Sequence, residues 1–159
     1  MAELRDIMVY LLSRYPSKFS HDLSNARLTK MIYLSDWLNC LSGGLPISKI
    51  DWYFDNHGPF VWDVKKTAEK HPEVFELEST NNMFGAKKTV FSLKSGKLEP
   101  ILTAREKVSI DKVIEITNPL VWSDFISLVY GTHPIATSER YSKLNLIEKA
   151  KEYKRISAI

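Results

Sequence analysis

The stretch "DWYFDNH", residues 51–57, contains two carboxylates and an imidazole, groups that commonly transfer protons in enzymes. Asp51, Asp55 and His57 could form a general acid–base set, and a hydrolase or nuclease is the activity that such a set would serve. The spacing is not specific for catalysis, because Asp and His beside a turn more often form the turn or cap a helix. The sequence therefore favours a structural role here, with catalysis as a minor alternative.

Metal and cofactor chemistry has little support in the sequence. The four histidines, His21, His57, His71 and His133, lie in separate segments and never at the spacings that place two metal ligands on one element. Cys40, the single cysteine, lies within an apolar helical pattern, which predicts a buried and unreactive thiol. The "SGGLP" stretch lacks both the spacing and the lysine of a phosphate-binding loop. We expect no metal, no cofactor and no enzymatic activity.

The composition is that of an ordinary folded protein. Of the 159 residues, 44% are hydrophobic and 26% are charged, and the net charge of +3 is too small to indicate a nucleic-acid partner by itself. No apolar run approaches the ~20 residues that span a membrane, and the N-terminus does not resemble a secretory signal. One cysteine allows no internal disulfide framework. We therefore expect a cytoplasmic protein that is not embedded in a membrane.

Apolar residues at spacings of three and four predict two helices in the first quarter of the chain. The first helix should end before Pro16. The second, over residues 26–44, is apolar around more than half its circumference and should be central. Ser24 or Asn25 can cap its start, and Gly43 can take the left-handed conformation at its end.

Helical patterns return in the second half of the chain. Thr103 and Glu106 stand at capping-box spacing and open a helix with apolar residues on one side. Asn118 and Pro119 start the next helix, over residues 120–130, which Gly131 ends. The remaining predicted segments are a polar loop over residues 132–145 and a last helix over residues 146–154.

A strand near residues 49–54 is predicted by alternating apolar and polar residues. Its apolar face consists of Ile50, Trp52 and Phe54. Pro59 suits the first turn of a helix, where its missing N–H has no partner to lose, and Asn56 or His57 can supply the cap. The sequence thus predicts a tight junction between this strand and a helix.

A β-hairpin is predicted near residues 73–94, because two alternating segments flank the polar loop "TNNMFGA" with Gly85 in it. The apolar residues expected on one face are Phe75, Leu77, Phe91 and Leu93. Glu76 and Glu78 are expected to face Lys88 and its neighbours across the strands and to help fix their register.

These patterns together predict the fold class. We expect an α+β, predominantly helical fold, compact, with a small antiparallel β component made of the strand near residues 49–54 and the hairpin near residues 73–94. No repeat, low-complexity tract or linker divides the chain. A single domain over residues 1–159 is the expected organisation.

Aromatic residues are dense between residues 37 and 62. They are Trp37, Trp52, Tyr53, Phe54, Phe60 and Trp62. Core packing is the expected role of Trp52 and Phe60. Trp62 lies off the helical stripe of its apolar neighbours, so we expect it to be partly exposed and available to a partner, since tryptophan is enriched at interaction hot spots.

The stretch "LTKMIYLSDWLNCLSGGLPISKIDWYFDNHGPFVWDVKKTAEK", residues 28–70, resembles the Panacea domain of the SocA-like antitoxins. Members have a helix rich in Leu and Tyr, a Gly-x-Pro segment, an aromatic strand, a Gly-Pro pair and a following helix. Gly58 and Pro59 match that pair, whereas His57 stands where many members have tyrosine. The later "LVYGTHPIATSERYSKLNLIEKAKEY" resembles the tail of some members.

This resemblance implies a mostly helical domain that acts by binding proteins. The implied partner is a protein toxin, usually encoded nearby, and at least one type of member delivers its toxin to an ATP-dependent protease. The candidate partner-binding residues are Trp37, Tyr53, Asp55, His57, Gly58, Pro59 and Trp62. Whether the toxin is blocked or degraded stays open, as does a use of the protein in phage defence or in a phage's answer to it.

Nucleic-acid binding is the alternative from another class. The hairpin near residues 73–94 could serve as the wing of a winged-helix-like regulator, with Lys87, Lys88 and Lys94 as its basic residues. Phosphate binding needs several cations on one surface, and the facing strand is acidic. A nucleic-acid partner is therefore not favoured.

Overall fold

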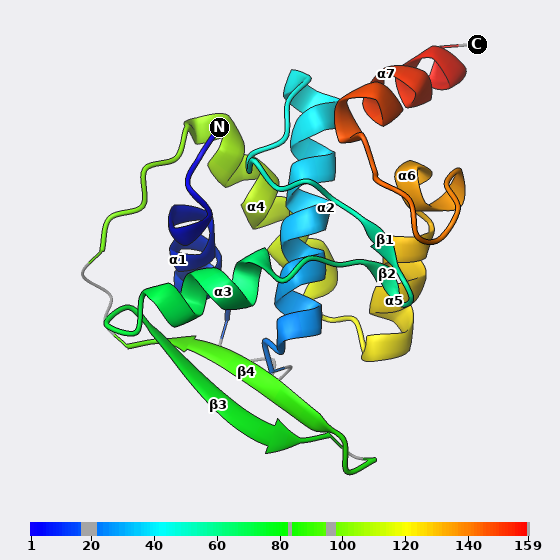
Figure 1. Ribbon diagram of the computed structural model, residues 1–159. Coiled ribbons are helices and arrows are strands. Elements are labelled where there is room, and N and C mark those ends of the chain that lie inside the picture. Colours follow the sequence, from blue (N-terminus) through cyan, green and yellow to red (C-terminus); the bar gives the residue numbers. More distant parts are fainter. Residues whose placement is uncertain (17–21, 83, 95–97, 159) are drawn as a thin grey trace.

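The computed structural model describes residues 1–16, 22–82, 84–94 and 98–158. These residues form helices around one long helix, with two small antiparallel hairpins beside them (Figure 1). The helices are α1 (Leu4–Arg14), α2 (Asn25–Gly43), α3 (Asp63–Lys70), α4 (Ala104–Thr117), α5 (Trp122–Tyr130), α6 (His133–Ala136) and α7 (Leu146–Ser157). The strands are β1 (Phe54–Asp55), β2 (Gly58–Pro59), β3 (Phe75–Asn81) and β4 (Lys87–Leu93). The predicted α+β, predominantly helical class is confirmed.

Helix α2 runs through the middle of the molecule, with the other helices arranged around it (Figure 1). Ser24 caps its start by accepting a hydrogen bond from the Arg27 N–H, as one of the two predicted caps. Gly44, rather than the predicted Gly43, ends it in the left-handed conformation with a φ of 85°. Buried residues cover most of its circumference, because neighbouring elements pack on several sides.

Helices α1 and α4 pack against each other, and α4 also packs against α2. Helix α1 ends before Pro16, as predicted. The predicted capping box of α4 is present: the Thr103 side chain accepts from the Glu106 N–H, and Glu106 accepts from the Thr103 N–H. Among the described residues, no helix is long and apolar enough to cross a lipid bilayer.

The β3–β4 hairpin has the predicted apolar face. Phe75 pairs with Leu93 and Leu77 with Phe91, and Phe75 and Phe91 are buried. The expected contact of Glu76 and Glu78 with Lys88 is wrong. Ser92 lies opposite Glu76, Val90 lies opposite Glu78, and Thr80 lies opposite Lys88. The register follows the burial of the two phenylalanines.

The predicted strand near residues 49–54 is largely wrong, because only Phe54 and Asp55 form a strand there. The preceding backbone amides of Ile47 and Ser48 donate to a buried side chain instead of a neighbouring strand. The predicted helix start at Pro59 is also wrong. Pro59 lies in β2, which pairs with β1 in a short hairpin, and α3 begins only at Asp63.

Asn56 and His57 accordingly do not cap α3. The N-cap position of that helix is Trp62, which forms no side-chain capping bond. The predicted polar loop over residues 132–145 contains the one-turn helix α6, and α5 starts at Trp122, two residues later than expected. The last predicted helix is confirmed as α7, which continues to Ser157.

Candidate functional site

The segment that leads into the β1–β2 hairpin is hydrogen-bonded to a buried carboxylate in the middle of α2. Asp36 is fully buried, and its oxygens accept hydrogen bonds from the Ile47 N–H and Ser48 N–H at 2.9 Å and from the Trp52 Nε1–H at 2.8 Å. The Ser48 hydroxyl donates a fourth. Burial raises the pKa of the Asp36 carboxyl, and these donors oppose that rise. The carboxylate thereby fastens the segment before β1 to α2.

Gly58 gives the hairpin its shape. Its φ of +102° is a conformation that side chains rarely adopt, and both Gly58 and Pro59 are buried. A Cβ at this position would lie 3.4 Å from Tyr130 Cε2 and 3.6 Å from Lys30 Cε. The Gly-Pro pair therefore forms β2 directly after the turn at Asn56 and His57, close to the protein body, in place of the predicted helix start.

A third segment, distant in sequence, completes the hairpin. The Phe54 N–H donates to Ser142 O at 2.9 Å, Tyr141 N–H donates to Phe54 O at 2.6 Å, and Leu144 N–H donates to Trp52 O at 2.9 Å. Tyr141 has a φ of +66°, the one positive value at a non-glycine position among the described residues. The surrounding hydrogen bonds hold it there at a cost of about 1 kcal/mol or more.

Arg140 braces the same region. Its Nε donates to Asn56 O at 3.1 Å, and its guanidinium carbon lies 5.7 Å from the ring centre of Phe54 and 6.0 Å from that of Tyr130. Sequence reasoning missed both Arg140 and Tyr141, because they lie in a stretch that looks like a polar loop. Their only sequence signal is a cation beside an aromatic residue.

Lys30 lies beneath the hairpin and was also missed. It is 2% exposed, and its Nζ is 5.7 Å from the ring centre of Phe60. Burial lowers the pKa of Lys30 to about 8, and the negative charge of Asp55 partly opposes this shift. A lysine inside the apolar pattern of the long helix is the signal that could have drawn attention to it.

Several side chains point outward from this framework. Trp62 is 55% exposed and Tyr141 is 63% exposed, which confirms the predicted exposure of Trp62. Trp62 makes an edge contact with Phe60, with ring centres 5.0 Å apart. Trp52 is buried as predicted, whereas Phe60, which was also expected in the core, is only half-buried. Large aromatic surfaces held on a fixed backbone are suited to binding another protein.

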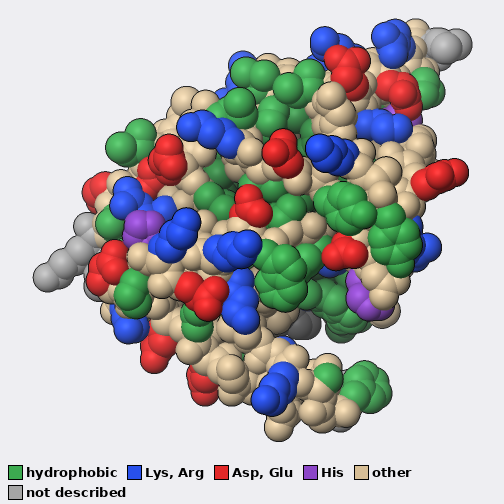
Figure 2. All heavy atoms as spheres, in the orientation of Figure 1, with side chains coloured by type: hydrophobic (Ala, Val, Ile, Leu, Met, Phe, Trp, Pro, Cys, Tyr) green, Lys and Arg blue, Asp and Glu red, His purple; other side chains and the backbone are tan. Residues whose placement is uncertain are grey.

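We call this surface the hairpin face. It consists of Tyr53, Asp55, His57, Phe60, Trp62 and Tyr141. Figure 2 shows hydrophobic side chains together with acidic and histidine side chains over β1 and β2, on the side turned to the viewer. Two hydrogen bonds link parts of this face. The Phe60 N–H donates to Tyr53 O at 3.0 Å, and the Tyr141 hydroxyl donates to Asn56 Oδ1 in the turn at 3.4 Å.

The residues with acid–base potential have other engagements. Asp55 Oδ1 accepts from the Asn56 N–H at 2.8 Å and so forms part of the turn. Asp51 and His57 are exposed, and His57 Nε2 lies 3.5 Å from Asn56 Nδ2. In the described residues, no hydrogen bond or ion pair joins His57 to either aspartate. The arrangement is that of a turn and not of an assembled proton-transfer pair.

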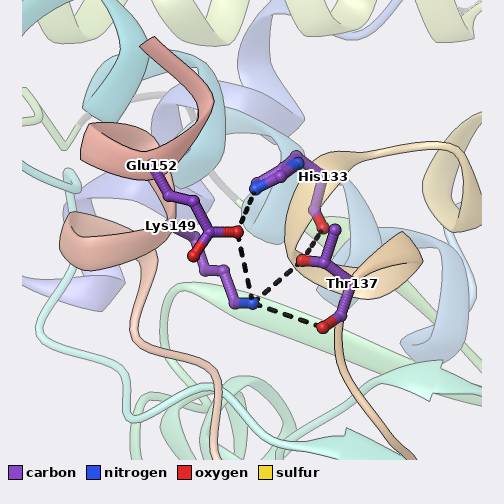
Figure 3. A network of polar contacts seen from close by, with 4 residues as sticks. All are labelled: His133, Thr137, Lys149 and Glu152. Atoms are coloured by element: carbon purple, nitrogen blue, oxygen red, sulfur yellow. Dashed lines mark hydrogen bonds and ion pairs between the residues drawn. The ribbon is translucent and has the colours of Figure 1, made fainter. Parts of the chain in front are cut away.

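Trp37, another candidate binding residue, is covered by the C-terminal part of the chain. It is 7% exposed, stacks on His133 at 6.5 Å and meets Tyr153 at 6.0 Å between ring centres. His133 and Glu152 point toward each other from α6 and α7, with Nε2 and Oε1 2.7 Å apart (Figure 3). Trp37 therefore has a different environment from the hairpin face.

Lys149 extends the same network, because its Nζ lies 2.9 Å from Thr137 Oγ1 and 3.9 Å from Glu152 Oε1 (Figure 3).

Cys40 is buried as predicted, and burial raises the pKa of its thiol to about 12. His21 lies outside the described residues. Among the described residues, no three His, Cys, Asp or Glu side chains are grouped closely enough to hold a metal ion.

The basic surface required by the nucleic-acid alternative is interrupted. Lys88 forms an ion pair with Asp22 at 3.1 Å, and the exposed Glu76 and Glu78 lie on the adjacent strand. Lys87 and Lys94 are exposed. This mixture of charges does not concentrate positive charge in the way that phosphate binding requires.

Comparison with known proteins identifies the family. A model of the family described as "Antitoxin SocA-like, Panacea domain" matches residues 28–134 of the 159-residue chain. The match includes most of α2, both hairpins and α5, whereas Tyr141 and α7 lie beyond it. No curated protein and no solved structure matched the chain. The family match supports an antitoxin-like role in partnership with a toxin, and it points to a role other than catalysis. The chain belongs to the SocA-like antitoxin family and contains its Panacea domain.

Proposed function

We propose that this protein is an antitoxin that neutralises a protein toxin by binding it directly through the hairpin face. The family match supports a toxin partner in general. The observation that supports the hairpin face as the binding surface is the exposure of Trp62. Its side chain is 55% exposed and packs edge-on against Phe60, directly after a hairpin in which Phe54 is buried. Tryptophan, tyrosine and arginine are the residues most enriched at binding hot spots.

The rigidity of the backbone supports the same proposal. Asp36 fastens the segment before the hairpin, Arg140 binds its turn, and residues 141–144 pair with β1. A surface that is ordered before binding loses less conformational entropy when the partner arrives. Of the binding residues predicted from the sequence, Tyr53, Asp55, His57 and Trp62 act as contacts in this proposal, and Gly58 and Pro59 shape the turn.

Trp37 is left out of the proposed surface, because His133 and Tyr153 cover it. Tyr141 is added to it. Direct binding is required both for simple blocking of a toxin and for delivery of a toxin to an ATP-dependent protease. The proposed contacts are therefore the same for both outcomes, and the fate of the toxin distinguishes them.

The test uses the product of the gene encoded beside this one as the candidate toxin. Co-expression should restore growth, and titration calorimetry should detect a complex. Trp62→Ala and Tyr141→Ala should each cost about 2 kcal/mol of binding free energy, roughly 30-fold in affinity. Trp122→Ala is the matched control, since Trp122 is 47% exposed on α5 and outside the hairpin face.

A loss of binding in Trp122→Ala equal to that in Trp62→Ala would contradict the assigned surface. An absence of binding to the neighbouring gene product would contradict the proposed partner. Immunoblots of the toxin during co-expression separate the two mechanisms. A constant amount supports blocking, and a fall that depends on an ATP-dependent protease supports delivery.

A further inference from the structure

The β3 strand has an edge to which no described segment pairs. Lys94 N–H donates to Val74 O at 2.8 Å, and Asn82 N–H donates to Ala86 O at 2.8 Å. Hydrogen-bonded positions alternate along an antiparallel strand, so residues 76, 78 and 80 bond to β4. The intervening backbone groups, those of Leu77, Ser79 and Asn81, consequently point away from β4.

The other side of the sheet is already occupied. Phe91 N–H donates to Leu23 O at 2.9 Å, and Ser24 bridges to Val90. Strand β4 therefore lies between this segment and β3, and Figure 1 shows β3 as the outer strand. The open edge is confined to β3, on the far side of the sheet from the segment that leads into α2.

The side chains along this edge alternate in character. Glu76 and Glu78 are exposed on one face, and neither takes part in an ion pair with a described residue. Leu77 lies half-buried on the opposite face. Phe84, which is 86% exposed, stands in the turn at the end of the edge. An added strand would therefore meet carboxylates on one face, and Leu77 followed by the polar Ser79 and Asn81 on the other.

Charge argues against a second copy of this chain as the occupant. Symmetric antiparallel pairing about Ser79 would set Leu77 opposite Asn81, a poor match. It would also place the Glu78 carboxylates of the two copies diagonally across the strands, with Thr80 and not a basic residue opposite each of them. Carboxylates at an edge are a common defence against such self-association. They are complementary to a different chain that carries lysine or arginine.

We propose that the β3 edge binds an extended segment of another protein, with basic residues at alternate positions, as an added strand of the sheet. Main-chain hydrogen bonds to Leu77, Ser79 and Asn81 supply the attachment, and Glu76 and Glu78 select for positive charge. The site is separate from the hairpin face. It does not depend on whether the hairpin face binds a toxin.

The probe is a blocked octapeptide of alternating lysine and valine, with the glutamate and valine counterpart as control. We expect the lysine peptide to slow amide hydrogen exchange of Leu77, Ser79 and Asn81 at least tenfold, measured by NMR. Its affinity should fall with added salt, because the selected contacts are ionic. The glutamate peptide should produce neither effect.

Two variants test the two parts of the site. Ser79→Pro removes an outward N–H without removing a hydrogen bond to β4, and should weaken the lysine peptide at least tenfold while the other amide signals stay in place. Glu76→Lys combined with Glu78→Lys should reverse the preference, so that the glutamate peptide binds better. This gain of binding cannot result from misfolding.

Equal binding of both peptides, exchange protection located at the hairpin face, or undiminished binding by a folded Ser79→Pro protein would overturn the proposal. A dimer of the unaltered protein that Ser79→Pro dissociates would also overturn it, by identifying a second copy as the occupant. Sedimentation velocity detects that outcome. Failure here leaves the toxin titration with Trp62→Ala unaffected, so the two proposals are tested separately.

Discussion

The Trp52 indole Nε1–H donates to the Asp36 carboxylate at 2.8 Å inside the protein, across 16 positions of sequence. The ring of Trp52 also meets Tyr33 edge-on, with centres 5.5 Å apart. One buried acid on the central helix thus positions the last residues before the hairpin. The polar contact fixes the location of the hairpin, and the aromatic packing around it excludes water.

Asp36→Asn should destabilise the fold by about 2 kcal/mol or more, because a side-chain amide would turn its N–H groups toward buried donors. Urea unfolding at pH 7 measures the change. Asp51→Asn is the control, since Asp51 is exposed, and it should stay within about 0.5 kcal/mol of the unaltered protein. Similar values for the two variants would contradict the anchoring role of Asp36.

Gly58→Ala should cost about 1–3 kcal/mol of unfolding free energy, because the backbone at this position has a φ of +102°. The added Cβ would make ordinary contacts with Tyr130 and Lys30, so the conformation and not crowding should dominate. Gly44→Ala separates the two effects, since Gly44 has a φ of +85° with no described atom within 4 Å of the added carbon. Thermal unfolding should give comparable losses for both, and a much larger loss at Gly58 would indicate crowding.

Lys30→Met should stabilise the protein at pH 7, by up to about 3 kcal/mol, because burial lowers the pKa of this lysine to about 8 from 10.5. Between these values the unfolded chain keeps the proton that the folded protein has released. The unaltered protein therefore gains stability as the pH rises through this window. The difference between the two proteins should shrink from pH 7 toward pH 10.

Urea unfolding at several pH values measures this difference. Lys66→Met is the control, because Lys66 is exposed on α3 and its replacement should show no such convergence. A difference that is independent of pH would contradict the buried charge of Lys30. A stabilised Lys30→Met protein that has also lost toxin binding would indicate that the lysine is retained for function and not for stability.

Glu152→Gln should weaken the attachment of α7 at neutral pH. The hydrogen bond from His133 lowers the pKa of the Glu152 carboxyl below 4.5, so this contact stabilises the protein at higher pH and is lost as the pH falls through the lowered value. Intrinsic fluorescence, to which Trp37 contributes from its place against His133, can follow the transition. The two proteins should differ at pH 7 and converge once the pH falls below the lowered pKa of Glu152.

Glu148→Gln provides the matched control on the same helix, because in the described part of the chain the Glu148 carboxylate meets only the exposed Lys151, with Oε1 and Nζ 3.5 Å apart. Its acid transition should coincide with that of the unaltered protein. If Glu148→Gln and Glu152→Gln behaved alike, the contact between His133 and Glu152 would not be what fastens α7.

The sequence by itself determined the elements that depend on neighbours close in the chain. The end of α1 before Pro16, the capping box of Thr103 and Glu106, and the paired faces of β3 and β4 follow from helical or strand periodicity and from local capping chemistry. The exposure of Trp62 and the burial of Cys40 followed from their positions in such patterns. The pattern over residues 28–70, which includes Gly58 and Pro59, indicated the family that the family match confirms.

Only the tertiary structure decided how the hairpin face is built. Asp36 accepts hydrogen bonds from the Ile47 and Ser48 amides and from the Trp52 side chain. Residues 141–144 pair with β1 from far along the chain. Sequence spacing carries no record of such contacts, because their energy is gained only when distant segments meet. For the same reason, the burial of Lys30 and the strained, exposed Tyr141 were visible only after the helices had been brought together around α2.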